Sequence, residues 1–343
     1  MKRFKSPDQI LGAVIGYSPA FNMGKAHLNE MKQAGMVPTA VADTNEKVLE
    51  AARADFPGIE TYTSVTDMLR RSAANMVAII TPHNTHTQLA VQCLKAGRHV
   101  VCEKPLAITT AECDRMIAVA RQKKLVLSTY HNRHWNGCIM NAVGRIGAGQ
   151  IGEVVGVAAH MCHYGKPGDW WRSSKSISGG VLYDWGVHLL EYSLQILQSD
   201  IKEVSGFAHS GHWAPQTAWK KDTNEDEGLV AVRFTNGKYL TLRISSIEAA
   251  PPRGWLEIVG TKGTYVFDYS TFEIHRVVNG ETIVTKGRNP NGQESQFYQN
   301  IADHLVKGTP LVITPEWARR PIHILDLADR SARQNRSLAA KYR

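Results

Sequence analysis

The sequence has little cysteine, and its cysteines are not spaced for a disulfide framework or a metal site. There are five of them in 343 residues, an odd number, and none forms a CxxC pair. This pattern argues against both a disulfide-stapled secreted fold and a structural zinc site. We therefore expect reduced, buried thiols and no bound metal.

Long apolar runs and low-complexity blocks are also missing. No stretch approaches the roughly 20 apolar residues that a membrane-spanning helix needs. The apolar segment at residues 10–16 is too short and too strand-like for the core of a signal peptide. With 43% hydrophobic and 21% charged residues, the composition is that of a globular protein. We expect a folded cytoplasmic protein that does not contact membranes.

The strongest compositional bias is a formal net charge of +9. The basic residues are scattered, many of them fall within residues 319–343, and no nucleic-acid-binding motif accompanies them. General solubility and the attraction of an anionic cofactor explain the charge equally well. Nucleic acid is therefore not an expected partner.

The first third of the chain alternates short apolar runs with segments of helical periodicity. This alternation is typical of βαβ units and predicts a doubly wound parallel sheet. The expected strands span residues 10–16, 38–43, 76–81, 98–102 and 126–129, and the expected helices span residues 24–34, 46–55, 85–96 and 109–123.

The pattern changes after about residue 130, where period-two strands and turns such as Asn236-Gly237 become frequent. We expect a mostly antiparallel open sheet. Its predicted strands span residues 153–163, 204–209, 229–234, 240–247, 256–259, 264–267 and 273–278, and its predicted helices span residues 138–146, 187–197, 293–307 and 315–335. The chain is about twice the usual size of a domain, so two domains are expected. The predicted fold class is α/β plus α+β: a Rossmann domain at residues 1–130 and an α+β domain at residues 131–343, whose C-terminal helix can pack back on the first.

The loop after the first strand departs from GxGxxG because its second glycine is absent and the turn from Gly16 to Gly24 is longer. Asp43, at the end of the second predicted strand, stands where a carboxylate accepts the ribose hydroxyls of a dinucleotide and repels a 2′-phosphate. This favours NAD over NADP, with a helix N-cap or a solvated strand end as the alternative. The loop candidates for cofactor binding are Gly16, Ser18, Phe21, Asn22 and Met23.

Three further motifs follow along the chain, and the spacing between them matters for the assignment. TPHNTH occupies residues 81–86, EKP occupies residues 103–105, and SGGVLYDWGVH occupies residues 178–188. Together they resemble the glucose-fructose oxidoreductase and inositol dehydrogenase family (Gfo/Idh/MocA), in which TPxxxH follows the fourth strand and EKP the fifth. The resemblance covers nearly the whole chain and implies a nicotinamide-dependent oxidoreductase of sugar-like alcohols or ketones.

Hydride transfer at an alcohol carbon requires a group that moves the hydroxyl proton and a donor that stabilises the developing alkoxide. Lys104 and His188 have the side chains for these two tasks. Asp184, four residues before His188, is expected on the first turn of the same helix, where its carboxylate can orient the imidazole. The resemblance makes His188 the acid/base, Asp184 its partner and substrate anchor, and Lys104 a polariser. The alternatives are a solvated lysine, a helix cap with a surface histidine, or a pair of metal ligands.

Several neighbours of these motifs are ambiguous from the sequence. Glu103 is either a contact of the nicotinamide ribose or Lys104, or a simple salt-bridge partner. His86 either belongs to the cofactor site, as the resemblance implies for Thr81 and Pro82, or caps the following helix. The peptide bond before Pro105 can be cis and so aim Lys104.

The substrate side is expected in residues 163–172, where aromatic faces suit sugar rings and basic groups suit hydroxyls. The candidates for substrate contacts are His163, Trp170 and Arg172, together with Lys104, Tyr130, Asp184 and His188. By resemblance, Arg133, Trp171 and Arg172 lie near the cofactor. A polar insertion at residues 210–227 is predicted to be either a lid or a subunit contact.

The leading hypothesis is an NAD-dependent dehydrogenase or reductase of a sugar, glycoside or cyclitol. One alternative is oxidation of a glycoside ring hydroxyl, with tightly bound cofactor, as a step toward glycosidic cleavage. A second is a non-catalytic dinucleotide or sugar sensor, which has no need of a proton-handling trio. The resemblance also implies a homodimer or homotetramer formed through the C-terminal sheet.

Overall fold

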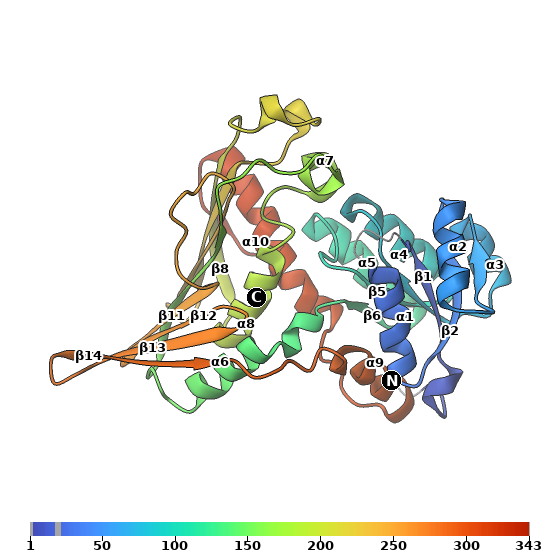
Figure 1. Ribbon diagram of the computed structural model, residues 1–343, viewed down its shortest axis with the longest axis horizontal. Coiled ribbons are helices and arrows are strands. Elements are labelled where there is room, and N and C mark those ends of the chain that lie inside the picture. Colours follow the sequence, from blue (N-terminus) through green and yellow to red (C-terminus); the bar gives the residue numbers. More distant parts are fainter. Residues whose placement is uncertain (1–2, 18–21, 343) are drawn as a thin grey trace. The chain divides into compact units, whose positions relative to one another are not determined.

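The computed structural model describes residues 3–17 and 22–342. The chain forms two compact units, each with its own sheet, which we call the parallel-sheet unit and the open-sheet unit (Figure 1). The parallel-sheet unit comprises Met1–Ala107, Ala111–Asn132 and Ser295–Ala318, and the open-sheet unit comprises Ile108–Thr110, Arg133–Glu294 and Arg319–Arg343.

The parallel-sheet unit is built on six parallel strands in the order β3-β2-β1-β4-β5-β6. These are β1 (Leu11–Ile15), β2 (Val37–Ala42), β3 (Glu60–Tyr62), β4 (Met76–Ile79), β5 (His99–Cys102) and β6 (Leu127–Thr129). Strands β4 and β5 are buried at every position, as expected for apolar runs covered on both faces by helices. The strand order reverses between β1 and β4, which is where ligands bind in sheets of this kind.

The helices of the parallel-sheet unit are α1 (Met23–Gln33), α2 (Glu46–Asp55), α3 (Val65–Arg71), α4 (His86–Lys95), most of α5 (Thr110–Lys123) and α9 (Gln296–Lys307). Local capping fixes where some of them begin: the Asn45 side chain accepts from the N–H of Lys47, and Ser64 accepts from Asp67. Helix α9 packs against α1 although the two are far apart in the chain. Strand β3 and helix α3 were missing from the predicted elements because both are short and partly exposed.

The open-sheet unit contains nine strands in the order β14-β13-β12-β11-β7-β10-β9-β8-β15. These are β7 (Val154–Cys162), β8 (Ile201–His209), β9 (Glu227–Phe234), β10 (Tyr239–Ser245), β11 (Leu256–Gly260), β12 (Gly263–Phe267), β13 (Thr271–Val278), β14 (Glu281–Arg288) and β15 (Leu338–Ala339). The pairing of β7 with β10 is parallel, whereas the other recorded pairings are antiparallel. The predicted fold class, a parallel Rossmann sheet followed by a mostly antiparallel sheet, is confirmed.

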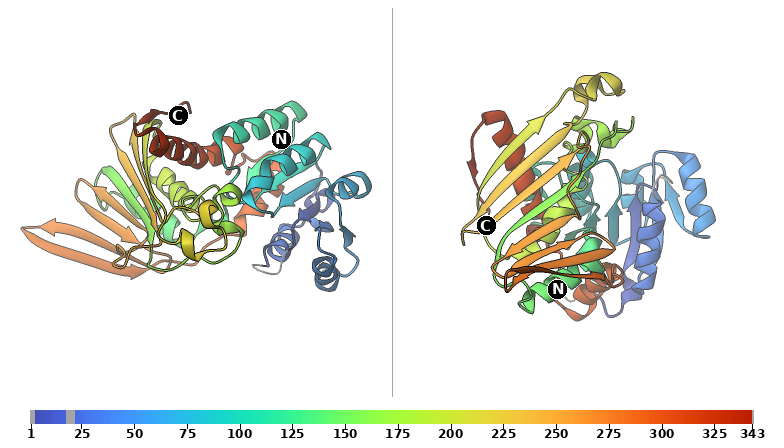
Figure 2. Two further views of the ribbon diagram at one scale, coloured as in Figure 1. Left: turned by 90° about the horizontal axis from the view of Figure 1, so that it is seen from above. Right: turned by 60° about the vertical axis from the view of Figure 1, so that its left-hand side comes forward.

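Helices of the open-sheet unit cover one face of its sheet. Helices α6 (Gly137–Gly147), α8 (Gly186–Leu197) and the part of α10 (Pro315–Gln334) that belongs to this unit lie on that face in Figure 2, and α8 packs on β7 and β10. Strands β9 and β10 accordingly alternate buried and more exposed residues. Strand β14 was not predicted because almost all of its residues are exposed, so its sequence carries no period-two signal. Short helix α7 (Lys175–Ser178) precedes the glycine turn.

The helices and the cysteines bear on two classes of protein that the composition argues against, membrane-spanning proteins and disulfide-stapled proteins. Within residues 3–17 and 22–342, no helix is both long and apolar enough to cross a membrane. All five cysteines are free thiols, and four of them are buried. Burial raises the pKa of the Cys93 thiol to about 12, so this group stays protonated and unreactive at neutral pH.

Candidate functional site

The carboxyl edge of the parallel sheet holds the predicted nucleotide residues together. Gly16, directly after β1, has φ +93°, and a β-carbon added there would lie 2.2 Å from the carbonyl oxygen of Ile80. Only glycine therefore lets this loop pass so close to the end of β4. Asp43, directly after β2, accepts hydrogen bonds from the backbone N–H groups of Tyr17 and Asn45, each at 2.9 Å. The glycine turn and the fixed carboxylate lie at the strand-order switch, which is where dinucleotides bind in sheets of this kind.

Asp55 holds two residues that flank the predicted phosphate loop, Tyr17 and Lys25. Helix α1 begins at Met23, after Asn22 in the left-handed region (φ 51°). Tyr17 donates to Asp55 at 2.8 Å, and Lys25 pairs with the same carboxylate at 2.6 Å. Burial, helped by Asp55, raises the pKa of Tyr17, so the phenol keeps its proton. Ser18 and Phe21, two of the predicted cofactor residues, lie outside the described residues.

The turn after β4 is joined to the EKP turn after β5 by a buried histidine. Both ring nitrogens of His86 lie near carbonyl oxygens, Nδ1 at 2.8 Å from Pro105 O and Nε2 at 2.9 Å from Thr81 O. Burial lowers the pKa of His86, which favours a neutral ring that donates to one of the two carbonyls. Thr85 closes the same turn by donating to Pro82 O at 2.7 Å. His86 thus begins α4 and also connects the two turns that carry the motifs.

The EKP turn is held by the side chain of Glu103. One carboxylate oxygen accepts from the backbone N–H of Lys104 at 2.9 Å, and the other lies 3.2 Å from Nε2 of His27. Burial alone would raise the pKa of Glu103, but the His27 hydrogen bond and the nearby positive charge of Lys104 lower it below its usual value. The Lys104–Pro105 peptide bond is cis. Glu103 therefore acts as a carboxylate that fixes the backbone of Lys104.

Tyr130 was predicted to contact substrate, but the structure places it in the core of the parallel-sheet unit. It is 2% exposed, its hydroxyl donates to Glu30 at 2.5 Å, and its ring centroid lies 4.1 Å from that of His27. These contacts commit both the ring and the hydroxyl to neighbours within the unit.

The open-sheet unit brings Arg172 and Asp184 together. Nη1 of Arg172 lies 2.5 Å from Oδ1 of Asp184, and the two side chains are 22% and 33% exposed. The guanidinium also lies over the rings of Trp170 and Trp171, with its carbon 5.2 and 5.1 Å from their centroids. His163 lies in an exposed stretch just after β7. The structure therefore brings a cation, a carboxylate and two indoles together in a partly exposed cluster.

The predicted placement of Asp184 on the first turn of a helix is wrong. Helix α8 begins at Gly186, after the N-cap residue Trp185, so Asp184 precedes it. Gly179 and Gly180, both with positive φ, shape the turn before the helix, and in this turn Asp184 contacts Arg172. His188 does lie in the first turn, is 6% exposed and meets the ring of Trp185 at 5.8 Å.

Two residues that the sequence reasoning missed support this region. Glu191, buried on α8, lies 2.5 Å from Nδ1 of His134 and accepts from Gln195. A carboxylate inside an otherwise apolar helix was the signal that could have found it. Arg133 is in the same region, with its guanidinium 5.0 Å from the Trp185 ring.

Asn224 is the second such residue, and it belongs to the polar insertion at residues 210–227. It donates to the carbonyl of Arg172 at 2.7 Å, and its own N–H donates to Ser173 O at 2.9 Å. Asp222 accepts from the Ser176 hydroxyl at 2.8 Å. The described part of the insertion is thus hydrogen-bonded to the segment that carries Arg172. Among the described residues, no group of three His, Cys, Asp or Glu side chains is placed to hold a metal ion.

A doubly wound sheet with a glycine turn and a carboxylate at its switch point, followed by a separate open sheet, is typical of two-domain dinucleotide-binding proteins. Residues 10–131 match the model of the oxidoreductase family with an NAD-binding Rossmann fold, and residues 140–266 match the model of the Gfo/Idh/MocA C-terminal domain. The two models together cover more than half of the chain. The chain belongs to the Gfo/Idh/MocA family.

Relatives and solved structures agree with this assignment. An uncharacterized oxidoreductase of Schizosaccharomyces pombe, C115.03, is 32% identical over 42% of this chain and 40% of its own length. The scyllo-inositol 2-dehydrogenase (NADP(+)) IolW of Bacillus subtilis is 21% identical over 100% of this chain and 99% of its own. An NAD-binding protein from Listeria innocua has a TM-score of 0.80 at 25% identity, covering 97% of both chains. The chain thus matches less than half the length of the first of these relatives but the whole length of the second.

Proposed function

We propose that this protein transfers hydride between a nicotinamide cofactor and a hydroxyl or ketone carbon of a sugar, glycoside or cyclitol. The observation that carries the proposal is the position of Lys104. It follows β5 at the same sheet edge as Gly16 and Asp43, and its backbone is fixed by Glu103. A lysine whose backbone is fixed at the nucleotide edge of such a sheet is suited to stabilise an alkoxide beside the nicotinamide.

The remaining roles follow from the chemistry of the side chains. His188 takes or returns the hydroxyl proton, because an imidazole exchanges protons near neutral pH. Asp184, held by Arg172, anchors a substrate hydroxyl, and Trp170, which is 37% exposed, offers a face to a sugar ring. Lys104 steadies the reacting oxygen. The nicotinamide ring supplies or accepts the hydride when the cofactor is bound.

Gly16, Asn22, Met23 and Asp43 are the described residues that would hold the dinucleotide in this proposal. Gly16 lets the loop pass close to the end of β4, and α1 begins just beyond this loop, where backbone N–H groups at a helix N-terminus suit a pyrophosphate. Asp43 favours NAD because a carboxylate repels a 2′-phosphate. Since IolW is named as NADP-linked, membership of the family does not decide this preference, and we base it on Asp43.

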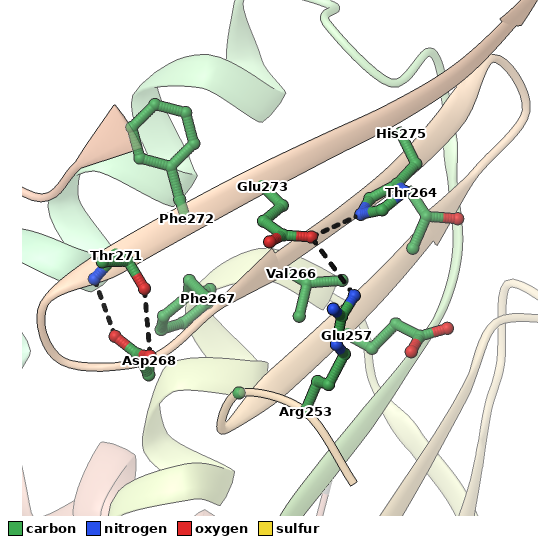
Figure 3. Close-up of a pocket in the computed structure, with 11 residues that line it drawn as sticks. Arg253, Glu257, Thr264, Val266, Phe267, Asp268, Thr271, Phe272, Glu273 and His275 are labelled. Atoms are coloured by element: carbon green, nitrogen blue, oxygen red, sulfur yellow. Dashed lines mark hydrogen bonds and ion pairs between the residues drawn. The ribbon is translucent and has the colours of Figure 1, made fainter. Parts of the chain in front are cut away.

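We also propose a homodimer or homotetramer that forms through the face of the open sheet opposite its helices. That face carries exposed Tyr239 together with a hollow of about 510 Å³ over β11, β12 and β13. Figure 3 shows Glu273 in this hollow, between His275 and Arg253. Hydrogen bonds from Lys286 and His275 lower the pKa of Glu273. A surface with apolar groups among ion pairs suits a second copy of the chain.

The test of the reaction is a substrate panel. Purified protein is incubated with NAD and, separately, NADP across sugars, glycosides and inositols, while the absorbance of reduced nicotinamide is followed. Denaturation of a parallel sample then releases any cofactor that was tightly bound. We expect reduction with at least one polyol and a preference for NAD. If no substrate is oxidised and the protein neither binds nor exchanges dinucleotide, the proposal is wrong, and bound cofactor without turnover on any alcohol would indicate a sensor.

A further inference from the structure

A fully buried histidine lies behind the EKP turn. His27, on α1, is 0% exposed, and both its ring nitrogens have partners within the parallel-sheet unit. Nε2 lies 3.2 Å from a carboxylate oxygen of Glu103, and Nδ1 lies 2.6 Å from the hydroxyl of Tyr298 on α9. Such a placement costs free energy unless each polar atom is satisfied, and here each is.

The chemistry of the partners fixes the direction of these hydrogen bonds. The Glu103 carboxylate, whose pKa is lowered, can only accept, so Nε2–H of His27 donates to it. With the proton on Nε2, Nδ1 can accept the hydrogen bond that the Tyr298 hydroxyl donates. Burial raises the pKa of Tyr298, so this phenol remains a donor. The result is one directed chain from Tyr298 through His27 to Glu103.

Aromatic packing leaves the imidazole little freedom to turn. The ring of Tyr130 lies 4.1 Å from the ring of His27, and the ring of Tyr298 meets it edge-on at 5.8 Å. Phe297 in turn packs edge-on against Tyr130 at 5.0 Å. Tyr130 is itself tied to Glu30 on α1 through its hydroxyl. His27 therefore has a fixed orientation, which is what a group that orients another side chain needs.

We propose that His27 is a positioning residue for the reaction: it holds the Glu103 carboxylate, and through it the backbone N–H of Lys104, in the geometry that the reacting oxygen requires. Glu103 uses one oxygen for His27 and the other for Lys104, so the two hydrogen bonds share one rigid carboxylate. This inference rests on the proposed function, since it assigns Lys104 to the reacting oxygen.

The same arrangement connects Lys104 with the proposed phosphate site. Helix α1 begins at Met23, beside the cofactor loop, and carries His27 on its second turn. A rigid helix can therefore place both the pyrophosphate contacts and the EKP turn. A misplacement of about 1 Å at a reacting group can cost about 100-fold in rate. Losing the His27 donor should consequently lower kcat more than it changes the affinity for the cofactor.

The experiment compares three variants with a matched control. His27→Leu removes both hydrogen bonds, His27→Gln restores a donor to Glu103 and an acceptor for Tyr298, and Tyr298→Phe removes one hydroxyl. Tyr265→Phe is the control, because Tyr265 is equally buried but lies in the open-sheet unit, where its hydroxyl accepts from Asn141. Each full-length protein is measured for kcat, KM, NADH affinity by fluorescence, and amide hydrogen exchange at Lys104.

We expect His27→Leu to lower kcat by about 10- to 100-fold and to speed exchange at Lys104, with NADH affinity changed less than threefold. His27→Gln should recover most of the loss, Tyr298→Phe should fall between, and Tyr265→Phe should match the parent. Unchanged exchange at Lys104, or faster exchange with unchanged kcat, overturns the proposal. Should His27→Leu not fold, His27→Gln and Tyr298→Phe still decide it. If the parent protein oxidises no alcohol, the proposed function fails, while the exchange data still show separately whether His27 holds the turn.

Discussion

The two units hold their functional side chains in different ways. In the parallel-sheet unit, Asp43 and Glu103 are fixed by backbone N–H groups, and Glu103 also by buried His27. In the open-sheet unit, Arg172 and Asp184 hold each other through a contact between two partly exposed side chains. Backbone hydrogen bonds set a position more rigidly than a contact between two flexible side chains does.

This difference suits the two proposed tasks. A cofactor is the same molecule in every turnover, so a rigid site lowers the cost of binding and orienting it. A polyol site needs donors and aromatic faces that can adjust to the substrate, and a stacked arginine provides these. Changes to Lys104 and the residues that fix it should therefore affect kcat, whereas changes to Arg172 in the open-sheet unit should affect KM for the substrate.

Replacement of Lys104 should have the largest effect. Lys104→Ala removes the cation proposed to stabilise the alkoxide and should lower kcat by roughly 100-fold or more. Steady-state kinetics measure this, and Lys95→Ala, an exposed lysine at the end of α4, is the control for loss of one positive charge. A loss below about threefold would reduce Lys104 to a scaffold residue.

Acid should weaken the parallel-sheet unit through His99. Its buried ring accepts the N–H of Val126 at 2.9 Å, and burial, with smaller contributions from Arg3 and His304, lowers its pKa from 6.5 to about 4. As the pH falls below 6.5, His99 becomes protonated in the unfolded chain, whereas in the folded chain it stays neutral until about pH 4. The contribution of neutral His99 to the free energy of unfolding is therefore fully present above pH 6.5. It is lost between pH 6.5 and 4, and the loss is about 3 kcal/mol at most.

Urea unfolding at pH 7 and pH 4.5 measures this loss, and His99→Gln removes the titrating ring. The variant should lose less stability than the parent over the same pH interval. If both lose equally, His99 is not the source of the acid sensitivity of this unit.

Two glycine-to-alanine substitutions, one in each unit, further test the comparison between the two units. Gly16→Ala places a β-carbon 2.2 Å from Ile80 O, and Gly206→Ala, on β8, places one 2.0 Å from Ala328 O. Both should destabilise by about 1–3 kcal/mol in urea, because neither backbone can accept the group without moving. Only Gly16→Ala should also weaken NADH binding, by about tenfold or more in a fluorescence titration. An equal loss of NADH affinity in both variants would contradict the separation of roles.

In the open-sheet unit, Arg172→Lys tests adaptable recognition of substrate. Lysine keeps the charge but loses the planar fork that contacts Asp184 and stacks on Trp170. We expect KM for the polyol to rise about tenfold while NADH affinity is unchanged. Arg233→Lys is the control, since that arginine pairs with Glu203 on the surface. A change in NADH affinity with an unchanged KM would assign Arg172 to the cofactor instead.

Asp43→Ala should have the smallest effect of the series. Without the carboxylate, discrimination against the 2′-phosphate of NADP should relax by about tenfold or less, measured as the ratio of kcat/KM for the two cofactors. Asp67→Ala, at an exposed position on α3, serves as the control. An unchanged ratio would show that Asp43 does not read the ribose.

The sequence was most informative where packing and spacing agree. Apolar runs predicted β1, β4 and β5 because these strands are buried on both faces, and the motif spacing placed EKP after β5. The contact of Arg172 with Asp184 was not predicted, because it depends on the backbone path of a glycine turn. The link between His27 and Tyr298 was also missed, since 271 residues separate the partners and no periodicity relates them.

The return of Ser295–Ala318 to the parallel-sheet unit has a consequence for how the protein is made. On the ribosome, β1 to β6 emerge early, but Tyr298 and the rest of α9 emerge only near the end of synthesis. A nascent chain that stops before this segment lacks the phenol that orients His27. Until α9 is made, the hydrogen-bond network behind the EKP turn lacks one partner, and a product truncated before α9 would expose the side of α1 that α9 covers to chaperones and proteases.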